Sequence, residues 1–123
     1  MYKIVIVGYG RLGQAMANYI SNNEKNFRIA GIFDVKQSIQ DVEFQNAVGL
    51  TCGSLAGFIE KEGVDIAVMC VPPEKALLVA DTVAGAGVKG IWNFTAVDLE
   101  LPDNIAVENV HMSDSLPRIA HHR

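Results

Sequence analysis

The stretch from Lys3 to Asp34 constrains the fold of this chain more than any other part of its sequence. It opens with the apolar run 4–7 (IVIV), which is typical of one strand buried in a parallel sheet. The pattern G-x-G-x-x-G follows at once, and apolar residues then recur at helical spacing. A second apolar run, 27–33, ends at Asp34, about twenty residues beyond the last glycine of the pattern. This order predicts a strand–helix–strand unit of the dinucleotide-binding type.

Each glycine of the pattern is expected to have its own role. Gly8 would allow the tight turn out of the strand, Gly10 would let the backbone approach a pyrophosphate, and Gly13 would let helix and strand pack closely. The start of the helix offers unpaired N–H groups and the positive end of its dipole, which suit a phosphate. Asp34 would accept hydrogen bonds from a ribose 2′-hydroxyl and repel a 2′-phosphate, which favours NAD(H) over NADP(H). The alternative is a purely structural glycine loop, because glycines also mark ordinary turns.

Length, composition and charge narrow the class of protein. The chain has 123 residues, half of them hydrophobic, so we expect one globular domain over residues 1–123. Its formal charge of −4 and the absence of a basic run argue against a nucleic-acid surface. The apolar stretch 66–71 is too short to span a bilayer, and no signal-peptide layout is present, so a cytoplasmic location is expected. Cys52 and Cys70 lack metal-ligand spacing, and Cys70 fits a buried strand as a small core residue.

The rest of the chain alternates between strand and helix patterns. Residues 35–46 are predicted to form a loop or short irregular segment, and residues 47–51 a short edge strand. Ser54 is the expected N-cap of a helix that ends at Glu62. The further predictions are strands over 65–71, 89–94 and 105–110, and helices over 74–86 and 113–121. This alternation predicts an α/β fold with a doubly wound parallel sheet, the Rossmann-like NAD(P)-binding fold.

In two of the predicted helices, the spacing of the apolar residues predicts which side chains pack against the sheet. In the first helix the expected face consists of Leu12, Met16, Tyr19 and Ile20. In the helix over 74–86 it consists of Ala76, Leu77, Ala80, Val83 and Ala84.

Ligands of such sheets bind at the carboxyl ends of the strands, near the point where the strand order reverses. Pro72 would end its strand, and Phe94 has an alternative interpretation as a core residue. No catalytic or metal-binding set is found, since no proton relay and no nucleophile with a nearby base occurs in the sequence. The expected cofactor-binding residues are Gly8, Tyr9, Gly10, Arg11, Leu12, Gly13, Asp34, Val71, Pro72, Asn93 and Phe94.

Eight segments distributed over nearly the whole chain carry a resemblance to a known family: 4–13, 17–19, 33–34, 71–72, 79–81, 86–91, 93–94 and 107–110. Together they resemble the cofactor domain of the Rex family of redox-sensing transcriptional repressors. The resemblance implies competitive binding of NADH and NAD⁺, a homodimer, and no catalysis, with Val71-Pro72 and Asn93-Phe94 flanking the nicotinamide.

The chain also departs from the family's pattern. DNA binding is not carried over, because the chain starts at the first Rossmann strand, without the family's winged helix. His111 and Met112 also differ from the family's usual residues.

Three functions therefore remain open at this point. The first is a non-catalytic NAD(H)-binding redox-sensing module. The second is the cofactor-binding subunit or fragment of an NAD-dependent oxidoreductase, whose substrate site would come from another chain. The third is a coenzyme A-binding domain, against which Asp34 argues because its charge would repel the 3′-phosphate of coenzyme A.

Overall fold

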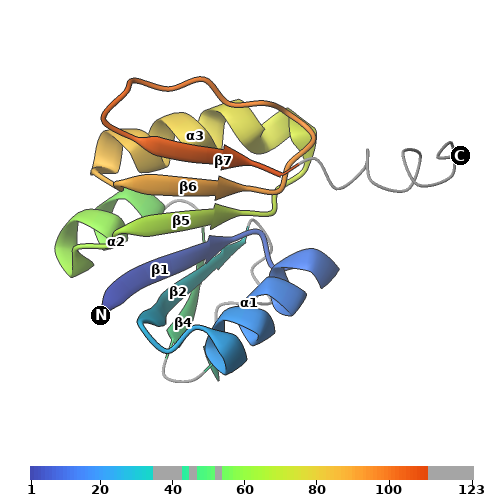
Figure 1. The fold of residues 1–123 in the computed structure, drawn as a ribbon, viewed down its shortest axis with the longest axis vertical. Coiled ribbons are helices and arrows are strands. Elements are labelled where there is room, and N and C mark those ends of the chain that lie inside the picture. Colours follow the sequence, from blue (N-terminus) through green and yellow to red (C-terminus); the bar gives the residue numbers. More distant parts are fainter. Residues whose placement is uncertain (35–42, 45–46, 52–53, 111–123) are drawn as a thin grey trace, which may run out of the picture.

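The computed structural model of the protein describes residues 1–34, 43–44, 47–51 and 54–110 (Figure 1). The predicted terminal helix over 113–121, and His111 and Met112, lie outside the described residues. Within the described part, no helix has the length and apolar character needed to cross a bilayer. The elements in chain order are β1 (Tyr2–Val7), α1 (Arg11–Asn23), β2 (Phe27–Asp34), β3 (Glu43–Phe44), β4 (Ala47–Thr51), α2 (Leu55–Glu62), β5 (Ile66–Met69), α3 (Pro73–Ala86), β6 (Gly90–Asn93) and β7 (Ala106–Asn109).

The described strands form one sheet in the order β3-β4-β2-β1-β5-β6-β7. Every pairing is parallel except that of β3 with β4. The order reverses between β1 and β5, which are direct neighbours, so the carboxyl ends of these two strands flank the switch point where doubly wound sheets bind ligands. The Rossmann-like fold predicted from the sequence is confirmed.

One edge of the sheet differs from the prediction, which placed the strand over 47–51 there. The strand predicted over 47–51 is present as β4, but β3 pairs outside it, within the stretch 35–46 predicted as a loop. A strand of two residues is too short to produce a periodic pattern of apolar residues, so β3 could not be predicted from such a pattern.

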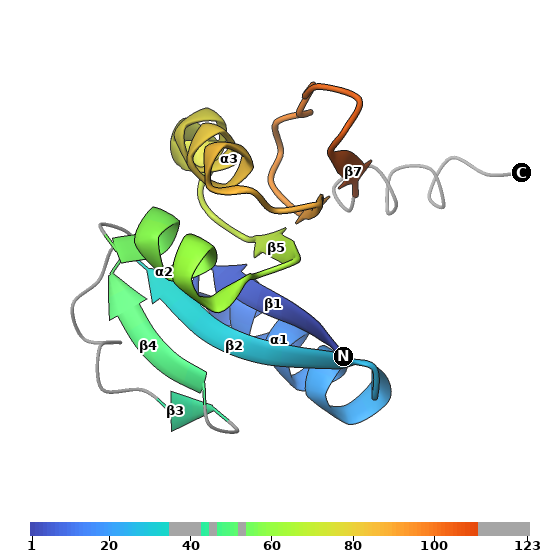
Figure 2. The same cartoon turned by 90° about the vertical axis from the view of Figure 1, so that its left-hand side faces the viewer.

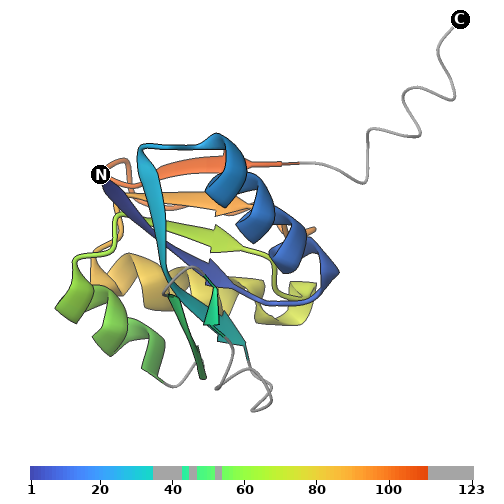
Figure 3. The ribbon, with the colours of Figure 1, turned by 90° about the horizontal axis from the view of Figure 1, so that it is seen from below.

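The helices cover the two faces of the sheet unequally. Along β1 the side chains alternate: Ile4 and Ile6 belong to the core under α1, whereas Val5 and Val7 belong to the core shared with α2 and α3. Figure 3 shows α1 on one side of the sheet and α2 and α3 on the other, and Figure 2 shows the latter two side by side. Helices therefore cover both faces of the sheet, as strands with apolar side chains on both faces require.

The predicted inward faces of α1 and α3 are partly wrong. Tyr19 is 46% exposed, while Gly13, Ala17 and Ile20 are the buried residues of α1. Leu77 is 63% exposed, and Val79 is buried in its place. Both helices approach the sheet through small or β-branched residues, so the large side chains that dominated the periodicity point outward.

A polar clamp holds the amino-terminal ends of the strands, at the edge opposite the switch point. The backbone N–H of Lys3 donates a hydrogen bond to Asp65 Oδ2 at 2.8 Å, and Lys89 Nζ lies 3.4 Å from Asp65 Oδ1. The Lys3 ammonium donates to the carbonyl oxygen of Glu62 at 2.7 Å. The hydrogen bond from Lys3 is the largest influence on Asp65, and together with Lys89 it lowers the pKa of this carboxyl.

Replacing Asp65 with alanine is expected to lower the free energy of unfolding at neutral pH by about 1 kcal/mol, because a charge-assisted hydrogen bond is lost. The carboxyl is easier to ionise in the folded protein, so its contribution is complete above the unfolded pKa of about 3.9 and is lost as the pH falls through the lower folded value. Urea unfolding of both proteins between pH 7 and pH 3 measures this difference. As a control, Lys89→Ala removes only an exposed ion-pair partner and should cost less than about 0.5 kcal/mol. A difference that grows on acidification would contradict this account.

Candidate functional site

In the glycine loop between β1 and α1, the packing requires glycine at Gly8 and Gly13 but not at Gly10. Gly8 has φ of 97°, and a Cβ there would lie 2.5 Å from the carbonyl oxygen of Cys70. A Cβ on Gly13 would overlap the carbonyl oxygen of Gly8. These findings confirm the tight turn and the close helix–strand packing predicted for the two positions. Gly10, in contrast, has open space within 4 Å of its Cβ position and an extended backbone with φ of −77°.

Asp34 holds the glycine loop in place. It is the last residue of β2, and its Oδ2 accepts a hydrogen bond from the backbone N–H of Tyr9 at 2.7 Å. The N–H of Gly8 donates to the carbonyl oxygen of Phe33 at 2.7 Å. The tip of β2 and the start of the loop are thus tied together by two hydrogen bonds, which places the carboxylate beside the N-terminus of α1.

A cavity of about 500 Å³ opens at the carboxyl ends of β1 and β5. It brings together most of the predicted cofactor-binding residues. Lys75, Leu78 and Val79 of α3, together with Cys70, line it as well and were missed. Their spacing was a usable signal, because positions 75, 78 and 79 share one face of a helix that starts at the cleft. The predicted residues that line the cavity are Gly8, Gly10, Arg11, Leu12, Asp34, Val71 and Pro72.

Among the described residues that line the cleft, we find neither a reactive thiolate nor a group of metal ligands. Burial raises the pKa of the Cys70 thiol to about 12, so it stays protonated and unreactive at neutral pH. Among the described residues, no group of three or more His, Cys, Asp or Glu side chains could hold a metal ion. The described lining of the cleft can bind and orient a ligand.

Asn93 and Phe94 do not line this cavity. The Asn93 side chain is 1% exposed and uses its full hydrogen-bonding capacity inside the protein. Its amide donates to the carbonyl oxygen of Val97 at 2.7 Å and to Asn109 Oδ1 at 2.8 Å. Its Oδ1 accepts from the backbone N–H of Thr95 at 3.0 Å and from the Thr95 hydroxyl at 2.7 Å. Asn93 thus fixes the loop after β6, and its backbone carbonyl also accepts a hydrogen bond, from the Val110 N–H at 2.8 Å.

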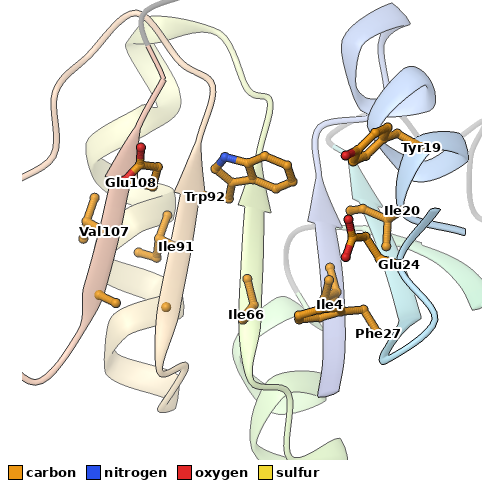
Figure 4. A pocket seen from close by; sticks show the side chains of 12 residues that line it. Ile4, Tyr19, Ile20, Glu24, Phe27, Ile66, Ile91, Trp92, Val107 and Glu108 are labelled. Atoms are coloured by element: carbon orange, nitrogen blue, oxygen red, sulfur yellow. The ribbon is translucent and has the colours of Figure 1, made fainter. Parts of the chain in front are cut away.

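Phe94 packs on the α1 side of the sheet, with its ring centroid 4.8 Å from that of Trp92. Trp92 in turn lines a second cavity of about 440 Å³, which lies between α1 and the strands β5, β6 and β7 (Figure 4). Most of its lining is apolar, and its acidic residues are Glu24, the C-cap of α1, and Glu108 from β7. Two carboxylates and no lysine or arginine make this second cavity unsuited to a diphosphate.

The first cavity combines a glycine turn, a helix N-terminus and an acid at the tip of β2, which is the geometry of a nucleotide site. A family model described as "CoA binding domain" matches residues 1–97. The chain belongs to this family. Within the CoA-binding family domain, residues 1–97 include the glycine loop and all eleven predicted cofactor-binding residues.

Individual relatives of this CoA-binding family domain are redox-sensing repressors. The redox-sensing transcriptional repressor Rex of Caldicellulosiruptor saccharolyticus is 47% identical over 120 residues, covering 94% of this chain and 52% of that protein. The crystal structure of RSP, described as a Rex-family repressor, in complex with β-NADH has a TM-score of 0.89 at 37% identity. That comparison covers 98% of this chain and 58% of RSP. The resemblance to Rex is confirmed, and the chain spans about half the length of the relatives that it matches.

RSP has also been solved with β-NAD⁺ and operator DNA. That structure has a TM-score of 0.91 at 37% identity, over 98% of this chain and 56% of RSP. The two complexes show that the same Rossmann-like fold, in RSP, accepts both oxidation states of the nicotinamide cofactor.

Proposed function

We propose that this chain is a non-catalytic NAD(H)-binding module of the Rex type, which senses the redox state of the nicotinamide pool. The observation that carries the proposal is the open position at Gly10. Gly8 and Gly13 are needed to build the turn, but nothing among the described residues requires a missing side chain at Gly10. A pyrophosphate bound at the N-terminus of α1 would explain the glycine, because it would occupy the space that a side chain at Gly10 would fill.

Different residues of the cleft would bind different parts of the dinucleotide. The backbone at Gly10, Arg11 and Leu12 would hold the pyrophosphate, and Asp34 would accept a hydrogen bond from the adenosine ribose. Leu78 and Val79 supply an apolar wall suited to the adenine ring. Val71-Pro72 and Asn93-Phe94 remain our prediction for the residues that flank the nicotinamide.

Coenzyme A is the second candidate ligand, which the description of the family favours. Both ligands carry an adenosine diphosphate, so the glycine loop alone cannot distinguish them. The discriminating group is Asp34 at the ribose, because coenzyme A has a 3′-phosphate and NADP(H) has a 2′-phosphate, and a nearby carboxylate disfavours either.

Isothermal titration of the purified chain with NADH, NAD⁺, NADPH and coenzyme A tests the proposal. Binding of NADH and NAD⁺, with much weaker binding of NADPH and coenzyme A, is the expected result. Binding of coenzyme A alone would replace the proposal with the second candidate, and no binding of any of the four would reject a nucleotide site formed by this chain.

Asp34→Ala is expected to weaken NADH binding by about 1.5–3 kcal/mol, the value of a hydrogen bond to a charged group. Asp34→Asn is the matched variant, because its amide oxygen can still accept the hydrogen bond from the Tyr9 N–H. It should keep the loop in place while it reduces the discrimination against NADPH. Calorimetry with both cofactors measures the change. Unaltered affinities in the folded variants would remove Asp34 from the ligand site.

The larger context is also proposed from the Rex relatives. We infer that residues 1–123 form a single domain that works in the cytoplasm as a homodimer, and the formal charge of −4 argues against a DNA contact by this domain. Sedimentation with and without NADH tests the dimer, and a monomer under both conditions would contradict it.

A further inference from the structure

Two cations meet at the cleft from different helices. Arg11 is the first residue of α1, and Lys75 lies in the first turn of α3; both are exposed to solvent and both line the cavity. Pro72 is the N-cap of α3 and Pro73 its first residue, and the N–H of Lys75 donates to the carbonyl oxygen of Pro72 at 3.0 Å. The cavity therefore lies between two helix N-termini, each with a basic side chain beside it.

The position of Lys75 has an electrostatic cost within the protein. A positive side chain in the first turn of a helix is disfavoured by the helix dipole. Glu74 lies in the same turn but does not line the cavity. Among the described residues, Lys89 forms an ion pair with Asp65, whereas Lys75 has no carboxylate partner. Folding alone thus gives no reason for a lysine at this position.

The charge of the cavity wall indicates what Lys75 would bind. Its charged lining residues are Arg11, Lys75 and Asp34, so the wall is positive in a chain with a formal charge of −4. Adenine and ribose are neutral, and the part of a dinucleotide that carries two negative charges is its diphosphate. Cations on both sides of a cleft suit such a group better than a single one.

We propose that Lys75 binds the diphosphate of the nucleotide from the side opposite the glycine loop. The inference rests on the proposed NAD(H) function and adds a residue that the glycine motif does not contain. NADH and NAD⁺ share the diphosphate, so Lys75 contributes equally to both and leaves their ratio of affinities unchanged. Because the contact is ionic and exposed, its contribution falls as the salt concentration rises.

Titration of the chain with NADH, NAD⁺, ADP and NADPH at low and at physiological salt tests this inference. For Lys75→Ala we expect Kd to rise about three- to tenfold for NADH, NAD⁺ and ADP alike, with a weaker dependence of Kd on salt. Lys75→Arg should restore most of the affinity. Lys25→Ala, which removes an exposed lysine from the turn after α1, is the matched control and should leave all values unchanged. Thermal unfolding of each variant confirms that it is folded.

The outcomes are separable. An unchanged Kd in Lys75→Ala, an effect on NADPH alone, or an effect on NADH without one on NAD⁺ would each overturn the diphosphate contact while the proposed function stands. If the unaltered chain binds none of these nucleotides, the proposed function fails, and this inference fails with it.

Discussion

Gly13→Ala is expected to destabilise the protein by about 3 kcal/mol or more, a large part of the stability of a small domain. The added Cβ would overlap the carbonyl oxygen of Gly8, which is a backbone atom and cannot rotate away. Relief would require α1 to move off β1, which would open the core around Ile6 and Ala17. Urea unfolding followed by circular dichroism measures the loss.

Gly57→Ala is the control for this substitution. Gly57 lies in α2 with open space at its Cβ position, so alanine there should stabilise the helix by about 0.5–1 kcal/mol. An unfolding midpoint for Gly13→Ala equal to that of the unaltered chain would show that the close approach of α1 to β1 is not needed for folding.

Gly10→Val is expected to have the opposite profile, with a large effect on binding and a small one on folding. The valine side chain would occupy the space in which we place the pyrophosphate, so Kd for NADH should rise at least about a hundredfold, or about 2.8 kcal/mol. Gly10 is also the N-cap of α1, where valine is a poor cap, so about 1 kcal/mol of stability is lost as well. Calorimetry and thermal unfolding of the same sample separate the two effects.

Gly10→Ser is the matched variant for this site. Serine is a favourable N-cap, so it should recover the stability that valine loses while its side chain still enters the ligand space. Full NADH affinity in both variants would mean that the ligand does not approach the backbone at Gly10.

The sequence predicted those parts of the molecule in which local pattern and tertiary packing agree. The buried strands and the glycine turn have strong local signals, and the turn behaves as the spacing indicated at Gly8 and Gly13. The tip of β2 also follows the pattern, since Asp34 reaches the loop through Tyr9.

The errors have a common physical cause. Apolar spacing cannot tell whether a helix packs through its large or its small residues, which explains Tyr19 and Leu77. It also does not show how a polar side chain is used: that of Asn93 forms hydrogen bonds inside the protein, and its place beside the ligand stays a prediction. Lys75 was missed although its spacing with Leu78 and Val79 was a usable signal, because its place beside Arg11 depends on where the start of α3 lies in space.

The placement of the single tryptophan has a practical consequence for spectroscopy. Trp92 lies on the α1 face of the sheet and contacts Phe94, whereas the nucleotide cleft opens at the ends of β1 and β5, with β5 directly beside β6. The indole emits light in the range that a reduced nicotinamide absorbs and an oxidised one does not. The protein thus carries its own donor fluorophore on the strand beside β5, and energy transfer from it would make the oxidation state of a bound nicotinamide optically visible without any added label.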